Sequence, residues 1–352
     1  MKIGTSIEQL AARVISEAQS KKDYAMDTRK LTMTDSANLR FTVGGAEKIV
    51  TPTKLCLDQI GGRVGIPSKY LERMRTEAPG LLAQNVNHWF TNVPETRMLR
   101  THNNGINSAR AFLSKVYRPL DNYDLLNSIL PHLQASGCEI KSAELTEKRL
   151  YLQCVTPKLV ADIKSANVGD TLYGGLVIRN SEVGCGSIGV EGLIYKLGCK
   201  NGMILPNAFR KHHVGRAGDG EWGEGDASEV FSDATRRLDD RAFWAKVNDV
   251  VTSMLSETKF RLAVDKFQGA TQVDTGDPQE AVEIVSKRFG LLEGEGKDVL
   301  KHLAKGGDLS LWGLANAVTR TAEDLPDYDR AIELERFGGE VIELPASTFS
   351  NN

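Results

Sequence analysis

The sequence predicts an α+β protein in which an antiparallel sheet of β-hairpins packs with helices and is followed by a mainly helical C-terminal region. Two observations lead to this fold class. Between residues 93 and 214, β-like runs come in pairs with helical segments between them, unlike the regular β–α alternation of a Rossmann-type layer. After residue 228, apolar residues recur mainly at helical spacing. With 41% hydrophobic and 26% charged residues, the 352-residue chain can bury an ordinary globular core.

The first part of the chain, residues 1–92, is predicted to be an N-terminal helical region. Residues 7–20 carry apolar side chains at helical spacing, and residues 39–43 resemble a strand. From residue 52 to residue 90 the pattern is helical again, interrupted by glycine and proline residues. We therefore expect two or three short helices there.

The second part, residues 93–214, is predicted to be a β-rich core with basic strands. Residues 96–101 and 108–118 flank Asn104 and Gly105, and an Asn-Gly pair supplies the positive φ that a tight hairpin requires. A helix is expected over residues 122–134. Two further hairpins are expected, one from residues 139–144 and 149–155, the other from residues 171–179 and 187–197.

Glycine and acidic residues accumulate over residues 215–228, which favours a loop or domain boundary. The remainder, residues 229–352, is predicted to be a helical C-terminal region. Its helices are expected over residues 233–266, 279–289, 297–305 and 309–334, with a short β-like tail at residues 339–344.

The sequence contains no recognisable catalytic or metal-binding motif. It lacks a GxSxG elbow, an HExxH motif and a Walker lysine loop. Cys185, Cys199, His212 and His213 lie in one region, but they do not form the close pairs that zinc sites use. Cys185 lies between two glycines on a turn that could expose its thiol, although hairpin geometry alone explains such glycines more often. We therefore predict no cofactor and no metal, and an enzyme using Cys185 or the His212–His213 pair ranks last.

The expected location is the cytoplasm. The five cysteines are an odd number and are scattered along the chain, which favours reduced thiols over a disulfide framework. Residues 1–17 have neither the apolar core nor the cleavage site of a signal peptide. No uninterrupted apolar stretch is long enough to span a bilayer, so no membrane association is predicted.

Charge is segregated within the β-rich part. Residues 96–118 and 193–216 contain basic but no acidic residues, whereas the whole chain has a net charge of −2, so any polyanion site must be local. The basic residues predicted to bind nucleic acid are Arg97, Arg100, Arg110, Lys115, Arg118, Lys196, Lys200, Arg210, Lys211 and Arg216. The aromatic residues predicted to stack on bases are Phe112, Tyr117, Tyr195 and Phe209.

Two arrangements of these windows remain open. In the first, basic side chains grip phosphates, and Arg110 and Arg118 project to the same side because they are an even number of residues apart on one strand. In the second, the aromatic residues face the core and the basic residues form an ordinary solvated strand face.

Several motifs resemble those of a phage and plasmid-like protein family catalogued as domain of unknown function number 932. The central match consists of Asn180, Ser181, Gly184 and Gly186, residues 191–197 and residues 199–202; residues 115–122, 316–320 and 328–331 support it. The resemblance implies the biology of a mobile element in a bacterial host cell and transfers no catalytic residue. Cys185 departs from the acidic or serine-rich turn expected in this family.

The predicted function is binding or annealing of single-stranded DNA in the recombination or replication of a phage or mobile element. Stacked hairpins with a helix across them are similar, at the level of the fold, to single-strand annealing proteins, which implies a homo-oligomer in rings or filaments. The alternative is a phage-encoded protein-interaction factor that acts on a host defence protein.

Overall fold

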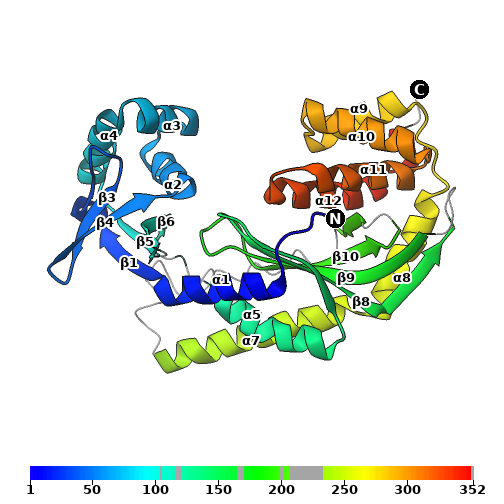
Figure 1. Cartoon of the computed structure of the whole chain (residues 1–352), viewed down its shortest axis with the longest axis horizontal. Helices are drawn as coiled ribbons and strands as arrows, with labels where there is room; N and C mark the ends of the chain where they lie inside the picture. The colour runs from blue at the N-terminus through cyan, green and yellow to red at the C-terminus, as the bar shows by residue number, and fades with distance from the viewer. Residues whose placement is uncertain are drawn as a thin grey trace, which may run out of the picture.

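The α+β class is confirmed in the computed structural model, which describes residues 1–103, 105–115, 117, 120–164, 170–198, 201–206 and 233–349. Figure 1 shows two lobes. The N-lobe contains β1 to β6 with α2, α3 and α4, and the C-lobe contains β7 to β11 with α1, α5 and α7 to α12. The predicted glycine-rich and acidic loop, residues 215–228, lies outside the described residues.

The N-lobe is built on a six-stranded sheet with the order β1-β5-β6-β4-β3-β2. Its strands are β1 (Lys22–Asp27), β2 (Leu31–Met33), β3 (Leu39–Val43), β4 (Ala46–Pro52), β5 (Thr96–Asn103) and β6 (Asn107–Ser114). The helices α2 (Lys54–Val64), α3 (Ser68–Glu77) and α4 (Pro79–Asn92) confirm the short helices that the sequence predicts. β3 confirms the strand expected at residues 39–43, whereas the further strands β1, β2 and β4 correct the prediction that residues 1–92 form a helical region.

The predicted boundary at residue 93 also falls inside this sheet. β1 pairs with β5, and β4 pairs with β6, so the sheet combines strands from both sides of that boundary. The edge strand β1 has no fully buried residue and therefore lacks the alternation of polar and apolar residues that identifies a half-buried strand. Its position depends on pairing with β5, which local sequence cannot indicate.

The C-lobe is built on a five-stranded antiparallel sheet with the order β11-β10-β9-β8-β7. Its strands are β7 (Glu139–Leu145), β8 (Leu150–Ile163), β9 (Asp170–Asn180), β10 (Gly189–Lys196) and β11 (Asn201–Ile204). The hairpin predicted at residues 139–155 and the one predicted at residues 171–197 are both confirmed. β8 and β9 also pair with each other, so the two hairpins form one continuous sheet.

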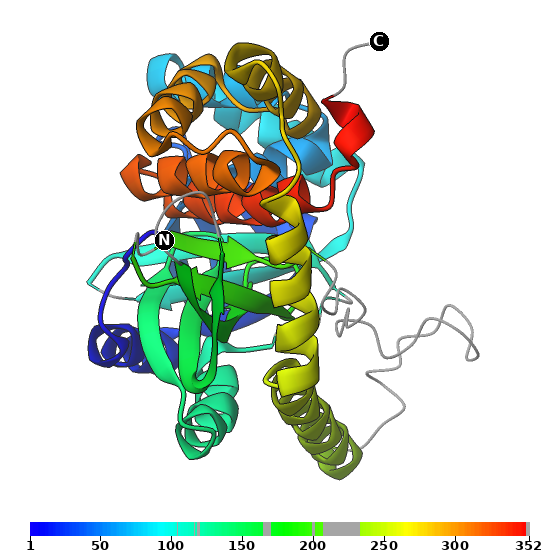
Figure 2. The ribbon, with the colours of Figure 1, turned by 90° about the vertical axis from the view of Figure 1, so that its right-hand side faces the viewer.

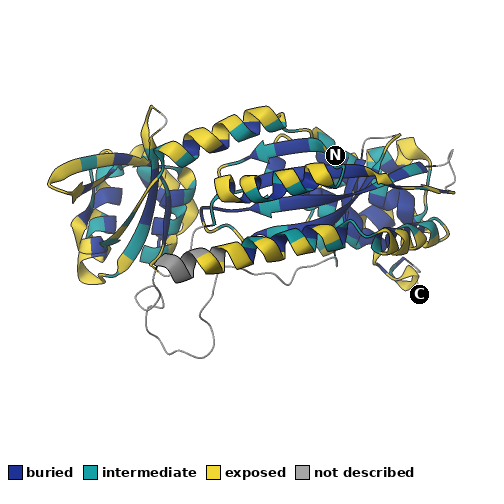
Figure 3. Cartoon of the chain, turned by 90° about the horizontal axis from the view of Figure 1, so that it is seen from below, coloured by how far each residue is buried: buried dark blue, intermediate teal, exposed yellow. Residues whose placement is uncertain are grey.

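Helices cover both faces of the five-stranded sheet. Leu152, Ile178 and Val190 pack with α1 (Ile7–Ser20), α5 (Asn122–Ala135) and α7 (Asp233–Met254). On the opposite face, Val177 and Leu193 pack with α12 (Tyr328–Ile342). Figures 1 and 2 show α11 and α12 on one side of the sheet and α1 and α5 on the other. Figure 3 shows these strands mainly as buried and the outer faces of the helices as exposed.

The remaining helices complete the predicted C-terminal region: α8 (Glu257–Ala270), α9 (Pro278–Phe289), α10 (Glu293–Gly306) and α11 (Leu311–Asp324). None of the helices in the described ranges combines the length and the apolarity that a membrane span requires. The predicted β-like tail at residues 339–344 is wrong, because α12 continues to Ile342. A Cβ on Gly339 would lie 2.0 Å from the carbonyl oxygen of Ile204, so a glycine is needed where α12 approaches β11.

Replacing Gly175 with alanine is expected to destabilise the protein by about 1–3 kcal/mol, the usual cost of overpacking a close-packed core. A Cβ at Gly175 would lie 2.0 Å from the carbonyl oxygen of Cys154 on the neighbouring strand, and that backbone cannot move without disturbing the ladder. Urea unfolding measures the change. Gly62→Ala is the control, because nothing lies within 4 Å of its Cβ position on α2. Equal stability of the two variants would contradict the prediction.

Candidate functional site

Arg100, one of the predicted nucleic-acid-binding residues, lies inside the junction between the lobes. Only 2% of it is exposed. Its Nε donates to Asp23 over 2.9 Å, and its Nη2 donates to Asp121 over 2.9 Å. Its Nη1 donates to the backbone carbonyl of Glu182 over 2.8 Å. These contacts correct the prediction that Arg100 contacts phosphate, because its charge is neutralised within the chain.

Arg110 on β6 takes part in the same junction. Its Nη2 lies 2.9 Å from a carboxylate oxygen of Glu182 and 3.4 Å from one of Glu17 on α1. Glu182 also accepts a hydrogen bond of 2.6 Å from the backbone N–H of Asn122, at the start of α5. A single buried carboxylate therefore connects β6 with α5. This pairing also corrects the predicted phosphate contact of Arg110.

The loop between β9 and β10, residues 181–188, connects the two lobes through further hydrogen bonds. Tyr117 donates its hydroxyl hydrogen to the carbonyl of Ser181 over 2.9 Å. Gln59 on α2 donates to the carbonyl of Val183 over 2.7 Å and accepts from the backbone N–H of Phe112 over 2.8 Å. The loop carries part of the family resemblance, and the contacts assign it a structural role. We call residues 181–188 the junction loop.

Lys196 and Arg97 are also paired within the chain. Lys196 on β10 lies 2.7 Å from the carboxylate of Asp170, and the indole N–H of Trp312 donates to the same carboxylate over 3.0 Å. Arg97 on β5 lies 2.7 Å from Glu95. The predicted basic surface therefore loses these two residues as well.

Lys115 lies just after β6. It is the one predicted basic residue in the described ranges whose side chain is exposed. The other predicted site residues lie outside those ranges, so the structure does not place them: Arg118, Lys200, Phe209, Arg210, Lys211 and Arg216. The expectation that Arg110 and Arg118 share one strand face is therefore not tested. β6 itself ends at Ser114.

Two of the four predicted stacking residues, Phe112 and Tyr195, lie in the core. Phe112 is 4% exposed and stacks on Phe90 with ring centroids 5.6 Å apart. Tyr195 is buried on the sheet face that α12 covers, and Tyr117 is half-buried. The alternative arrangement, with aromatic side chains in the core, is thus confirmed for Phe112 and Tyr195, which corrects their assignment as base-stacking residues.

Most of the acids that neutralise these basic residues are distant in sequence, and Glu95, the partner of Arg97, lies just before the window at residues 96–118, which is why the acid-free windows were misleading. Arg100 pairs with Asp23, which is 77 residues before it in the sequence. Lys196 pairs with Asp170, which is 26 residues before it. A window of about 20 residues reports local composition, whereas strands and loops bring remote side chains together. Sequence reasoning missed Glu17 and Glu182 for this reason.

Cys185 shows no sign of nucleophilic chemistry. It is half-buried in the junction loop, and burial raises the pKa of its thiol, which opposes formation of the reactive thiolate. Across the described part of the chain, no three histidine, cysteine or acidic side chains form a group that could hold a metal ion. His212 and His213 lie outside that part.

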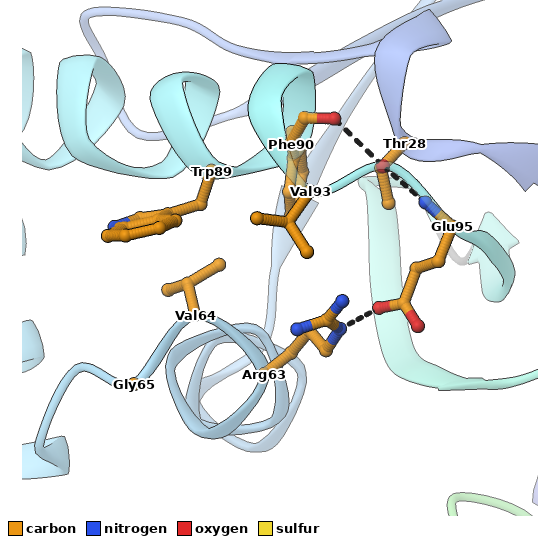
Figure 4. A pocket seen from close by; sticks show the side chains of 8 residues that line it. All are labelled: Thr28, Arg63, Val64, Gly65, Trp89, Phe90, Val93 and Glu95. Carbon is orange, nitrogen blue, oxygen red and sulfur yellow. Dashed lines mark hydrogen bonds and ion pairs between the residues drawn. The ribbon is translucent and has the colours of Figure 1, made fainter.

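The N-lobe contains a pocket of about 270 Å³ that the sequence analysis missed. Figure 4 shows its lining side chains, which come mainly from the C-terminal ends of α2 and α4 and from the residues that follow them: Thr28, Arg63, Val64, Gly65, Trp89, Phe90, Val93 and Glu95. Arg63 contacts Glu95 directly. The pocket thus combines aromatic and aliphatic walls with an ion pair. The sequence signal for it is weak, since isolated apolar residues are common on protein surfaces.

Comparisons with protein-family models, with curated proteins and with solved structures found no significant match to this chain. The resemblance to the phage and plasmid-like family therefore stays a prediction.

Proposed function

We propose that this protein binds nucleic acid, with single-stranded DNA of a phage or mobile element as the predicted ligand. The observation that carries the proposal is the acid-free basic composition of residues 193–216 and of the end of the window at residues 96–118. Within these windows, Arg97, Arg100, Arg110 and Lys196 form ion pairs inside the chain, so we leave them out of the candidate interface. Its remaining members are Lys115, Arg118, Lys200, Arg210, Lys211 and Arg216.

The covered sheet limits how a nucleic acid could bind. Because helices pack on both faces of the five-stranded sheet, bases cannot lie across those strands as they do on an open β-platform. The proposed contacts are instead with phosphates, through segments that follow β6 and β11. Such contacts give affinity that depends strongly on salt and little on sequence.

The test is fluorescence anisotropy with a single-stranded oligonucleotide over a range of salt concentrations. Combining Lys115→Ala with Arg210→Ala and Lys211→Ala is expected to weaken binding and to flatten the salt dependence by about 0.7 in log–log slope for each lost phosphate contact. The charge-matched control replaces exposed C-lobe lysines instead, at Lys287, Lys297 and Lys305. An absence of binding at low salt, or an equal loss in the control, would refute the proposal.

The proposed homo-oligomer is tested in the same samples by size-exclusion chromatography with light scattering. A single-strand annealing protein is expected to form larger assemblies when the oligonucleotide is added, because neighbouring subunits share one strand. A monomer with and without DNA would leave simple strand binding in place and exclude the annealing model.

A further inference from the structure

The ion pair in the lining of the N-lobe pocket, Arg63 with Glu95, belongs to a cluster of three charged residues, because Arg97 lies next to Glu95 outside the lining. Arg63 contacts Glu95, and the Nε of Arg97 lies 2.7 Å from the same carboxylate oxygen. Two guanidinium groups therefore share one carboxylate. The Arg97 guanidinium also lies 5.8 Å from the centroid of the Phe112 ring, which keeps it beside the aromatic core. The carboxylate of a bound ligand could accept a hydrogen bond from the Arg63 guanidinium, because Glu95 uses only part of its five N–H donors.

The walls of the same pocket expose large apolar side chains. Trp89, in the last turn of α4, is 41% exposed, and Val93, directly after α4, is 45% exposed. Figure 4 shows the Trp89 ring, Val64 and Val93 on one side and the Arg63 guanidinium directed towards Glu95 on the other. An apolar group that entered between them would cover surface that now faces water.

We propose that this pocket binds an acidic segment of a partner protein, which inserts one apolar side chain and places a neighbouring carboxylate beside Arg63. The volume of about 270 Å³ is slightly below the roughly 300–1,000 Å³ of pockets for drug-sized ligands, so it suits a single side chain. The Arg63–Glu95–Arg97 cluster carries one more positive than negative charge. This favours an acidic residue next to the apolar side chain that enters the pocket. This inference is independent of nucleic-acid binding, and it gives the alternative role, protein interaction, a defined site.

The first arm of the test compares two probes, N-acetyl-leucine and N-acetyl-leucinamide, by ligand-observed NMR with the full chain. They share the apolar side chain and differ only in the carboxylate. For ligands of this size we expect a Kd of about 1 mM for the acid. The amide is expected to bind at least about tenfold more weakly, since one charge-assisted hydrogen bond accounts for a factor of that order. Equal binding of both probes, or binding of neither, overturns the proposal.

The second arm uses variants of the pocket. Glu95→Gln removes the competing carboxylate and is expected to tighten binding of the acid by about tenfold while leaving the amide unchanged. Trp89→Ala is expected to weaken both probes. Tyr70→Ala is the matched control, because Tyr70 is an exposed aromatic residue on α3 that does not line the pocket.

Urea unfolding of each variant shows whether the fold is retained. If Glu95→Gln unfolds the N-lobe, Arg63→Gln provides the second route, with the expectation that the preference for the acid over the amide disappears. A preference that persists in Arg63→Gln overturns the assigned role of Arg63.

Discussion

Replacing Arg100 with alanine is expected to destabilise the protein by about 3–5 kcal/mol, the usual cost of removing one partner from a buried ion pair. The side chain is almost fully buried and bonds Asp23, Asp121 and the carbonyl of Glu182. Without it, Asp121 keeps Lys21 as a partner, whereas the Glu182 carbonyl loses a charged donor at the junction. The lobes are therefore expected to separate more easily.

Urea unfolding followed by circular dichroism measures this effect, and limited proteolysis of the segments around the junction loop reports local opening. Lys115→Ala is the matched control, since Lys115 is also basic and follows the adjacent strand but is exposed. Its stability is expected to stay within about 0.5 kcal/mol of the original protein. If Arg100→Ala were as stable as Lys115→Ala and instead lost affinity for DNA, the structural role assigned to Arg100 would be wrong.

Replacing Glu191 with glutamine is also expected to have a large effect. It should lower the free energy of unfolding by about 3 kcal/mol at neutral pH. Glu191 on β10 is 2% exposed, and its carboxylate lies 2.8 Å from Arg336 on α12 and 3.2 Å from Arg179 on β9. Glutamine keeps the shape and one acceptor but leaves two partly buried guanidinium groups without a counter-charge. The variant therefore weakens the attachment of α12 to the sheet.

The same substitution has a pH signature. Burial raises the pKa of the Glu191 carboxyl, but the attraction of Arg336 and Arg179 outweighs burial, so the pKa is lowered in the folded protein. A lowered pKa contributes stability above the unfolded value of about 4.3, and that contribution is lost as the pH falls through the folded value. The stability difference between the original protein and Glu191→Gln is thus expected to shrink below about pH 4.3. A difference that stayed constant from neutral to acidic pH would contradict this assignment.

Local patterns were sufficient for much of the fold. The hairpin of β5 and β6, the paired strands of the C-lobe and the helix α5 all follow from spacing and turn chemistry within about 20 residues. The edge strand β1 and the helical end of α12 could not be predicted in this way. β1 is a strand because it pairs with β5, and Gly338 and Gly339 stay helical because α12 packs closely on α11 and β11.

The candidate site could be predicted from the sequence less well than the fold. Arg97, Arg100, Arg110 and Lys196 do lie in strands, yet the direction of most of these side chains and the partners they meet depend on remote segments. Glu182 reaches Arg110 only after the junction loop has folded against β6, and Trp89 meets Val64 only when α4 packs beside α2. Exposure of a charge is a property of the assembled molecule, because the free energy of a buried ion depends on the partners that surround it.

By itself, the sequence determined the α+β class, the hairpins of the C-lobe and most of the helices, because hydrogen bonds and turns within hairpins and helices are made between residues close in the chain. Only the tertiary structure decided that Arg100, Arg110 and Lys196 serve as internal ion pairs and that both faces of the five-stranded sheet are covered. The physical reason is that electrostatic and packing energies are set by distance in space, which bears no fixed relation to separation along the chain.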